Sequence, residues 1–446
     1  MRYLRITNYV LFFVTKHINP VADKHYEITL EKLTYGGDTL GRLTDGRAVF
    51  VPFGLPGERV RVRLVDEKRG FARAELLEVL DESPDRIKPK CKHFFSPRPL
   101  GEGMGVRACG GCHYQNLSYE NQLKAKTDIL RDQLQRIGRM ENPPVKPMVA
   151  SPDEWNYSNQ VQFHLTNDGK LGFAGAGFIP ALISITECHL PEQAINELWP
   201  QLEFEPYQEI ELVSLRAGTD GDLILVLESE TPETPDIEIE AGISITHVYD
   251  ENTVVIAGND HVYIRVLERD FKISATSFFH VNTKMAGKLV EYLLAKLPLT
   301  QSATLLDVDC GVGLFSAFFA SKCKQVIGIE PSHSEFEDFA VNLDEFNNVE
   351  LYEGLAEEIL PALAGQITNP TYILLEPPGT GIEKGALDAI ISIKPQAIAY
   401  VSCDPSTLAR DAARLISAGY RLDEITPFDL SPQTIHIGSI GIFTRA

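Results

Sequence analysis

The chain has 446 residues, of which 44% are hydrophobic and 23% are charged, and this composition is typical of a protein with several buried cores. No stretch reaches the roughly 18 apolar residues of a membrane-spanning helix, so we expect no association with a membrane. The seven cysteines are odd in number and far apart, which argues against a disulfide framework and favours metal binding or catalysis in a cytoplasmic setting.

The net charge of −21 is unevenly distributed along the chain. Residues 191–260 contain 17 acidic residues and one basic residue, Arg216, whereas residues 84–146 contain 12 Lys and Arg against 6 acids. We expect the acidic segment to be a solvated outer face. The negative net charge is therefore compatible with a basic, nucleic-acid-binding face elsewhere on the protein.

The first 22 residues contain a short apolar stretch without a convincing cleavage site, and we expect a poorly ordered leader there. Residues 23–82 then alternate apolar and polar side chains in short runs separated by Gly-Gly, Asp-Gly and Leu-Pro-Gly. This period of two predicts a small, all-β barrel. Basic side chains gather late in it, namely Arg61, Arg63, Lys68, Arg69 and Arg73.

The rest of the chain predicts two further domains. Residues 118–139 have the pattern of a basic, amphipathic helix, and residues 155–270 are mostly strands around an acidic loop at 228–241. We therefore assign 83–270 to a β-rich central domain. Residues 271–446 alternate strand and helix patterns, which predicts a doubly wound parallel sheet and an α/β fold class.

Four cysteines of the central domain form the first candidate site. Cys109 and Cys112 are a CxxC pair on a Gly-Gly turn, where two thiolates can face one metal, and Cys91 and Cys188 flank them at a distance. The spacing alone leaves an iron–sulfur cluster, a zinc ion and free thiols open.

A glycine-rich turn in the C-terminal domain forms the second candidate site. The segment 305–313 reads Leu-Leu-Asp-Val-Asp-Cys-Gly-Val-Gly, a strand that turns tightly into a helix, where backbone amides can approach a ligand closely. The next strand ends in Glu330, about 20 residues further on, as expected of an acid that binds ribose hydroxyls. A nicotinamide or an adenosylmethionine cofactor would fit this pattern.

Cys403 is the third candidate. It lies in the phrase Val-Ser-Cys-Asp-Pro-Ser-Thr-Leu-Ala-Arg-Asp at 401–411, between a short apolar strand and the start of a helix. This places its thiol at the carboxyl edge of the sheet, beside a helix N-terminus, and we expect its thiolate to be stabilised there.

These phrases together resemble the uracil-5 RNA methyltransferase family, which makes 5-methyluridine in bacterial tRNA and rRNA. The phrases Gly-Asp-Thr-Leu-Gly-Arg and Val-Pro-Phe-Gly-Leu-Pro-Gly-Glu resemble the family's TRAM domain, an OB-like RNA-binding barrel, and Cys-Gly-Gly-Cys-His-Tyr-Gln resembles its iron–sulfur segment. The resemblance implies a Rossmann-like class I methyltransferase domain at 271–446, a TRAM barrel at 23–82 and an RNA partner. We expect a monomer.

The resemblance also implies a role for each candidate residue. Cys403 would be the nucleophile, and the cofactor S-adenosyl-L-methionine would be bound by His280, Asp309, Glu330 and Glu376. A [4Fe–4S] cluster would be held by Cys91, Cys109, Cys112 and Cys188, although Cys91 and Cys109 are farther apart than is common in the family.

Several positions depart from the family pattern. Asp309 stands where the family carries an aromatic residue, and His280 where it carries Gln. In the Asp-Pro-Pro-Arg loop, Asp has become Glu376 and Arg has become Gly379. The general base, a Glu in the family's Thr-x-His-Val-Glu phrase, is replaced by Gly438.

Three functions fit this pattern. The first is an active or slow RNA methyltransferase in which His436, Glu376 or water replaces the base. The second is a degenerate paralogue that binds RNA without turnover. The third is an iron–sulfur sensing protein on the same scaffold.

Overall fold

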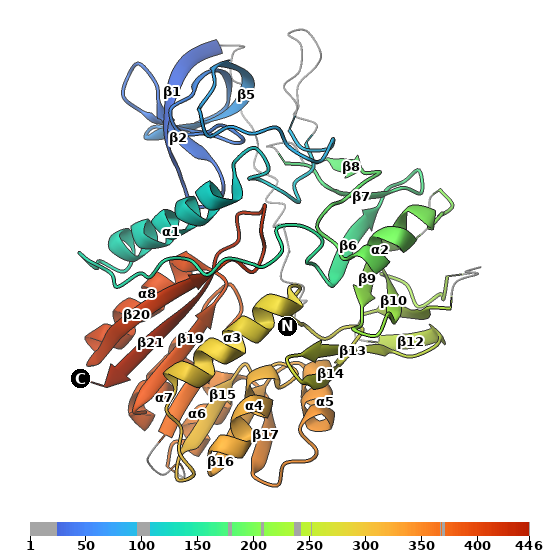
Figure 1. The fold of residues 1–446 in the computed structure, drawn as a ribbon, viewed down its shortest axis with the longest axis vertical. Coiled ribbons are helices and arrows are strands. Elements are labelled where there is room, and N and C mark those ends of the chain that lie inside the picture. Colours follow the sequence, from blue (N-terminus) through green and yellow to red (C-terminus); the bar gives the residue numbers. More distant parts are fainter. Residues whose placement is uncertain are drawn as a thin grey trace.

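The computed structural model describes residues 25–95, 108–176, 181–206, 209–235, 242–250, 252–365, 367 and 371–445. The predicted leader at 1–22 lies outside these residues. A small barrel, a central sheet and a C-terminal α/β domain follow one another along the chain, and the barrel and the α/β domain lie at opposite ends of the long axis (Figure 1).

Five strands form the predicted N-terminal barrel: β1 (His25–Leu33), β2 (Thr39–Arg42), β3 (Ala48–Val51), β4 (Arg59–Glu67) and β5 (Phe71–Asp81). They close in the order β1-β2-β3-β5-β4. Alternate side chains such as Val60, Val62 and Leu64 are almost fully buried inside, which is the packing that a period of two produces. The predicted barrel is therefore confirmed.

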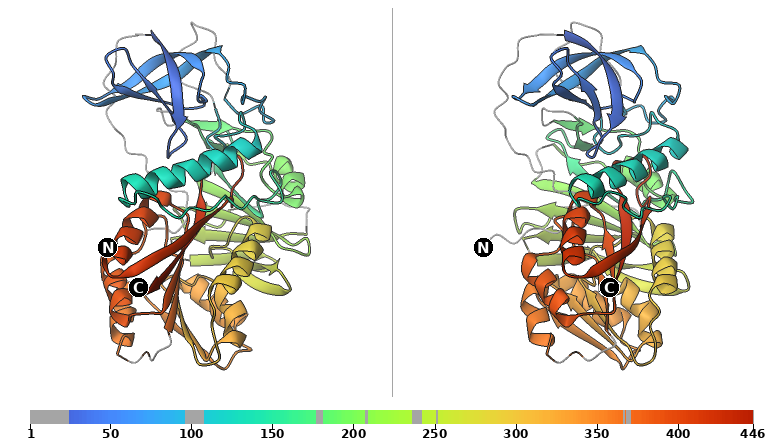
Figure 2. Two further views of the ribbon diagram at one scale, coloured as in Figure 1. Left: turned by 60° about the vertical axis from the view of Figure 1, so that its left-hand side comes forward. Right: turned by 90° about the vertical axis from the view of Figure 1, so that its left-hand side faces the viewer.

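Helix α1 (Tyr119–Arg136) lies across the top of the C-terminal domain, beneath the barrel (Figure 2). It corresponds to the helix predicted at 118–139. Its apolar face, with Ile129, Leu130 and Leu134, packs into the same core as Leu408 of helix α8 (Pro405–Ser417). The helix thus connects the barrel side of the molecule to the C-terminal domain.

The central sheet has seven strands in the order β12-β11-β10-β9-β6-β7-β8. They are β6 (Gln160–Leu165), β7 (Leu171–Ala174), β8 (Leu182–Ser184), β9 (Ile210–Ala217), β10 (Leu223–Ser229), β11 (Ser244–Tyr249) and β12 (Asn252–Ala257), with helix α2 (Gln193–Leu198) and a 3₁₀ turn, Trp199–Gln201, before β9. A hairpin of β13 (His261–Val266) and β14 (Arg269–Ser274) follows and packs into a core shared with the C-terminal domain.

The C-terminal sheet has seven strands in the order β17-β16-β15-β18-β19-β21-β20. They are β15 (Thr304–Val308), β16 (Gln325–Glu330), β17 (Val349–Glu353), β18 (Thr371–Leu375), β19 (Ala397–Ser402), β20 (Tyr420–Phe428) and β21 (Gly438–Arg445). The first five strands of this order are parallel and β21 runs antiparallel to β19. The predicted doubly wound sheet is confirmed.

Successive residues of the strands in this sheet pack into different hydrophobic cores, one on each face of the sheet. Leu305 packs with α3 (Thr283–Lys296), α4 (Leu314–Phe319) and α5 (His333–Asn342), whereas its neighbour Leu306 packs with α6 (Ala356–Leu363), α7 (Lys384–Ile393) and α8. Helices therefore cover both faces, and the open edge at the strand ends is left for a site. Among the described helices, none is long and apolar enough to span a membrane.

Candidate active site

Four predicted site residues meet at one edge of the C-terminal sheet. Asp309 follows β15, Glu330 ends β16, Glu376 follows β18 and Cys403 follows β19. These strands are neighbours in the sheet and point the same way, so the ends of all four meet at one edge. The order of the strands thus brings together residues that are far apart in the sequence.

The glycine-rich turn is held by Glu330. Its two carboxylate oxygens accept hydrogen bonds from the backbone N–H of Gly311, at 2.7 Å, and of Ser332, at 2.8 Å. Gly313 has a φ of 86°, and a β-carbon there would lie 2.4 Å from Leu343. At Gly311 a β-carbon would meet only Glu335 Oε2, at 3.8 Å, so the backbone is open to a ligand at this point.

Five acidic side chains, which we call the carboxylate cluster, surround this turn: Asp307, Asp309, Glu330, Glu335 and Glu376. Burial raises the pKa of Asp307 to about 8 and that of Asp309 to about 7, and the charge of Glu376 adds to both shifts. Burial likewise raises the pKa of Glu335 to about 7. Asp309 also adopts a left-handed φ of 56°, which is unusual for a residue other than glycine.

His280 faces Glu376 across this cluster. Its Nε2 lies 3.2 Å from Glu376 Oε1, but the pair is not aligned as a hydrogen bond, and this nitrogen is buried without a hydrogen-bond partner. Its loop is held by the side-chain amide of Asn159, which donates to the His280 carbonyl at 2.9 Å. The structure therefore brings the four predicted cofactor residues close to one another at this edge of the sheet.

Cys403 is exposed, and helix α8 begins two residues later. The helix N-terminus does not stabilise its thiolate as expected, because Asp404 caps the helix: Asp404 Oδ1 accepts from the N–H groups of Ser406 and Thr407, both at 2.8 Å. Although the residue is exposed at the surface, the surrounding protein partly desolvates its thiol, and this desolvation, with the charges of Asp404 and Glu376, raises the pKa of Cys403 to about 11. These effects disfavour the thiolate, in contrast to the stabilisation expected from the sequence.

The two glycines that replace family side chains lie close to the Cys403 segment. A β-carbon at Gly379 would lie 3.8 Å from Cys403 Sγ. In the antiparallel pair of β19 and β21, the last paired residues are Ser402 and Ser439, so Cys403 and Gly438 are the next residues of the two segments. Position 379 therefore lies next to the nucleophile, and the register of β19 and β21 brings position 438 toward the same segment, where its β-carbon would meet Leu430.

A loop before β21 is held by buried polar contacts with α1. Lys126 Nζ donates to Asp429 Oδ1 at 2.6 Å, and both side chains are fully buried. Gln122 donates from Nε2 to the side chain of Gln433 and accepts from its backbone N–H, at 2.9 and 3.0 Å. In this loop burial lowers the pKa of His436 to about 4, which leaves a neutral imidazole at pH 7.

The four predicted metal cysteines lie near one another. Burial is the largest cause of a raised pKa for each of them, and the charges of Cys91, Cys109 and Cys188 all act on Cys112. Within the described part of the chain, however, no three His, Cys, Asp or Glu side chains are arranged to hold a metal ion. The predicted cluster thus stays a prediction.

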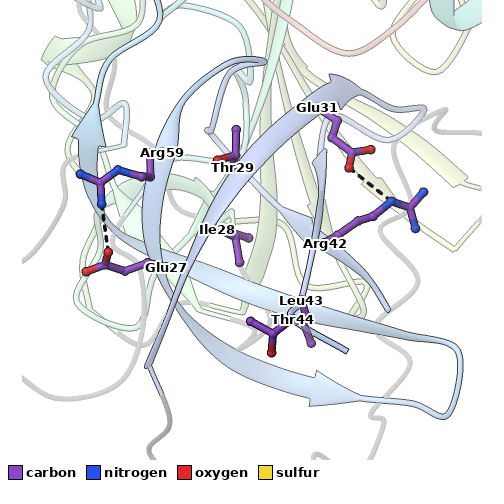
Figure 3. A pocket seen from close by; sticks show the side chains of 8 residues that line it. All are labelled: Glu27, Ile28, Thr29, Glu31, Arg42, Leu43, Thr44 and Arg59. Carbon is purple, nitrogen blue, oxygen red and sulfur yellow. Dashed lines mark hydrogen bonds and ion pairs between the residues drawn. The ribbon is translucent and has the colours of Figure 1, made fainter. Parts of the chain in front are cut away.

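The basic residues predicted on the barrel are largely paired with acids. Arg63 contacts Glu75, and Lys68 lies 3.1 Å from Asp66. In a pocket of about 330 Å³ on the barrel, Arg42 pairs with Glu31 and Arg59 with Glu27, at 3.2 and 3.0 Å (Figure 3). Several basic side chains of the barrel, including Arg63 and Lys68 of the predicted cluster, are therefore ion-paired with acids.

Sequence reasoning missed Glu335 and Tyr35. Glu335 belongs to the first turn of α5 and accepts from Phe278 N–H at 3.0 Å, and Tyr35 of the barrel donates its hydroxyl hydrogen to Asp404 Oδ2. Neither stands in a motif of its own. Tyr35 is 369 residues from its partner, so no local pattern could have revealed the contact.

Comparisons with known proteins agree with this architecture. A family model described as tRNA (Uracil-5-)-methyltransferase matches residues 243–446, and a TRAM domain model matches residues 24–77. RNA methyltransferases of Halalkalibacterium halodurans and Aquifex aeolicus are 30% and 31% identical to this chain, over 93% and 95% of its length and 96% and 99% of theirs.

A solved structure shares the fold. The tRNA (uracil-54, C5)-methyltransferase of Pyrococcus abyssi, solved in complex with S-adenosyl-L-homocysteine, has a TM-score of 0.68 and 22% sequence identity to this chain, and the match covers 94% of this chain and all of that one. The glycine-rich turn, the sheet order and the barrel are thus features of a known architecture. The chain belongs to a family of RNA methyltransferases, its residues 243–446 match the tRNA (Uracil-5-)-methyltransferase model, and it carries a TRAM domain.

Proposed function

We propose that the protein transfers a methyl group from S-adenosyl-L-methionine to carbon 5 of a uridine in rRNA or tRNA, with Cys403 as the nucleophile. The observation that carries this proposal is the position of the exposed Cys403 thiol, at the same sheet edge as the open glycine-rich turn. The cofactor, when bound, supplies an electrophilic methyl group. Gly311, Glu330, Asp309, His280 and Glu376 would hold it.

In this proposal Cys403 acts first. Carbon 5 of uracil is a weak nucleophile, and addition of the thiolate to carbon 6 raises its electron density so that it can take the methyl group. Because the pKa of Cys403 is raised to about 11, formation of the thiolate requires that the charges disfavouring it are offset. A cationic cofactor beside Glu376 would offset one of the charges that raise this pKa.

The last step needs a base. The proton at carbon 5 must be removed before the thiol can leave, and Gly438 cannot remove it. Glu376 is the best placed substitute, because its carboxylate is close enough for its charge to act on Cys403. His436 is the alternative, as a neutral imidazole. We therefore propose slow release of a methylated enzyme–RNA adduct.

The glycines favour a second candidate function, an RNA-binding paralogue without turnover. The family's Arg at position 379 and its general base at position 438 are both replaced by glycine, and Asp309 adds a carboxylate where an aromatic ring is expected. We propose weakened cofactor binding on this ground, by about 1 kcal/mol for a lost stacking contact. Calorimetry should show tighter binding after Asp309→Tyr with His280→Gln, and no gain would contradict this reading.

One experiment separates the two functions. The purified full chain is incubated with the methylated cofactor and total RNA, and nucleosides are measured by mass spectrometry. Formation of 5-methyluridine that is lost in Cys403→Ala supports the enzyme. Binding of RNA without product or covalent adduct supports the paralogue and contradicts the proposed reaction.

We further propose that Cys91, Cys109, Cys112 and Cys188 hold a [4Fe–4S] cluster. Their mutual proximity supports this, and so does burial, which disfavours free thiolates and makes a compensating metal favourable. A cubane spreads its four thiolates farther apart than a single zinc ion does. Anaerobically purified protein should contain about four irons per chain. Zinc in equal amount to protein would contradict the cluster.

The remaining expectations are also proposals. The free cysteines suit a cytoplasmic setting, and the TRAM barrel supports RNA as the partner of a monomer. We propose domain boundaries at 82 and 270. Size-exclusion chromatography with light scattering would test the monomer, and limited proteolysis would test the boundaries.

A further inference from the structure

The turn between β1 and β2 of the barrel reaches the C-terminal domain. Its residues 34–38 are closed by hydrogen bonds from Thr34 N–H to the Asp38 carbonyl, at 2.9 Å, and from Gly37 N–H to the Thr34 carbonyl, at 3.1 Å. A β-carbon at Gly37 would lie 2.5 Å from Ile435 Cγ2 and 3.3 Å from His113. The turn is thus seated directly against the loop that precedes β21.

Tyr35 at the tip of this turn contacts the nucleophile segment. Its hydroxyl donates to Asp404 Oδ2, while Asp404 Oδ1 accepts from the first N–H groups of α8 and from Ser406 Oγ at 2.6 Å. One carboxylate therefore joins the barrel to the start of the helix that follows Cys403.

Asp404 and Cys403 are also linked electrostatically. The charge of Asp404 raises the pKa of the neighbouring thiol, as does that of Glu376, and the pKa of Tyr35 is raised by burial, by Asp404 and by the charge of Cys403. These are the charged groups that act on the thiol. A hydrogen bond that Asp404 accepts offsets part of its negative charge, which would otherwise disfavour the thiolate.

We propose that Tyr35 is a positioning residue for the nucleophile: through Asp404 it fixes the Cys403 segment and supports formation of the thiolate. The TRAM barrel is then part of the active site as well as an RNA-binding unit. The inference rests on the proposed role of Cys403, and its test uses neither RNA nor cofactor.

The readout is the rate at which iodoacetamide alkylates Cys403 in the folded full chain between pH 7 and 11, followed by mass spectrometry of its peptide. Tyr35→Phe removes only the hydroxyl that donates to Asp404, so the full charge of Asp404 should raise the pKa of Cys403. The thiolate fraction then falls, and we expect alkylation at pH 8 to slow about twofold. Asp404→Asn keeps a helix cap and removes the charge, so alkylation should become faster.

A double-variant comparison tests whether Tyr35 acts through Asp404. In the Asp404→Asn background, Tyr35→Phe should no longer change the alkylation rate. Slowing of the same size in both backgrounds, or no slowing in either, would overturn the proposal. Hydrogen exchange of the peptide around 402–408 should also increase in Tyr35→Phe, and unchanged exchange would contradict the positioning role.

Two adjacent glycines, Gly36 and Gly37, provide a matched pair of variants whose effect does not depend on the Tyr35 hydroxyl. Gly36 and Gly37 have φ values of 95° and 89°, so alanine strains both similarly, but only Gly37→Ala collides with Ile435. Gly37→Ala should therefore displace the turn and slow alkylation more than Gly36→Ala does. Equal rates would overturn the proposal. If Cys403 alkylation behaves as expected and no 5-methyluridine forms, the positioning role stands and the proposed reaction fails.

Discussion

On one side of the Cys403 thiol, residues 402–407 are joined by hydrogen bonds that fix this segment. Ser402 Oγ accepts from Asp404 N–H at 3.1 Å, and Asp404 caps α8. On the other side, positions 379 and 438 are glycines. The contacts that place the thiol, from its sequence neighbours and from Tyr35, are thus present, whereas the family's side chains at positions 379 and 438 are absent.

The largest effect is expected on turnover, from restoring the missing base at position 438. Gly438→Glu alone would collide with Leu430, because a β-carbon at 438 lies 2.7 Å from its side chain. Combined with Leu430→Ala, it should raise turnover about a hundredfold to ten-thousandfold, since a general base contributes that much. Turnover is measured as 5-methyluridine per enzyme, with Leu430→Ala as the control. A folded double variant as slow as this control would refute the missing-base argument.

The next largest effect is expected on stability, from loss of the buried ion pair that holds the loop before β21. Lys126→Met leaves Asp429 buried without its cation and should lower the free energy of unfolding by about 3–5 kcal/mol. Lys124→Met, at an exposed position of the same helix, should change it little. Denaturant unfolding measures both. Equal stability of the two variants would show that the buried pair does not hold the loop.

A cation at position 379 should stabilise the Cys403 thiolate and so test whether this position affects activation of the thiol. Gly379→Arg places a guanidinium close to Cys403 Sγ, which favours the thiolate and should speed alkylation of Cys403 at pH 8 about tenfold. Gly365→Arg adds the same charge at a distant exposed position and serves as the control. An equal increase in both variants would mean that position 379 has no special role.

The smallest effect is a pH dependence of stability. Asp307, with a pKa of about 8, is protonated in the folded protein at pH 7 and ionised in the unfolded chain, so stability is lost as pH rises from about 4 toward 8. Asp307→Asn should flatten this loss by on the order of 1 kcal/mol per pH unit. Melting curves between pH 6 and 8 test it, with exposed Asp344→Asn as control; an unchanged slope would contradict the buried acid.

The fold and most of the candidate site could be predicted from the sequence because their signals are local. The barrel, α1 and the doubly wound sheet follow from side-chain periods, and Cys403 and the glycine-rich turn stand at strand ends. Local patterns cannot show which charges surround a group. Only folding creates the burial and brings together the charges of Asp404 and Glu376 that raise the pKa of Cys403. The same holds for the acids that pair with the barrel arginines.

The central claim is that Cys403 adds to uridine and that release of the methylated product is slow. The direct measurement is the amount of covalent protein–RNA adduct formed with uridine-containing RNA and methyl-labelled cofactor, compared with free 5-methyluridine over time. We predict that labelled adduct approaches one per enzyme before free product appears, and that Cys403→Ala forms none. Steady release of product without adduct, or adduct formation in Cys403→Ala, would contradict the account.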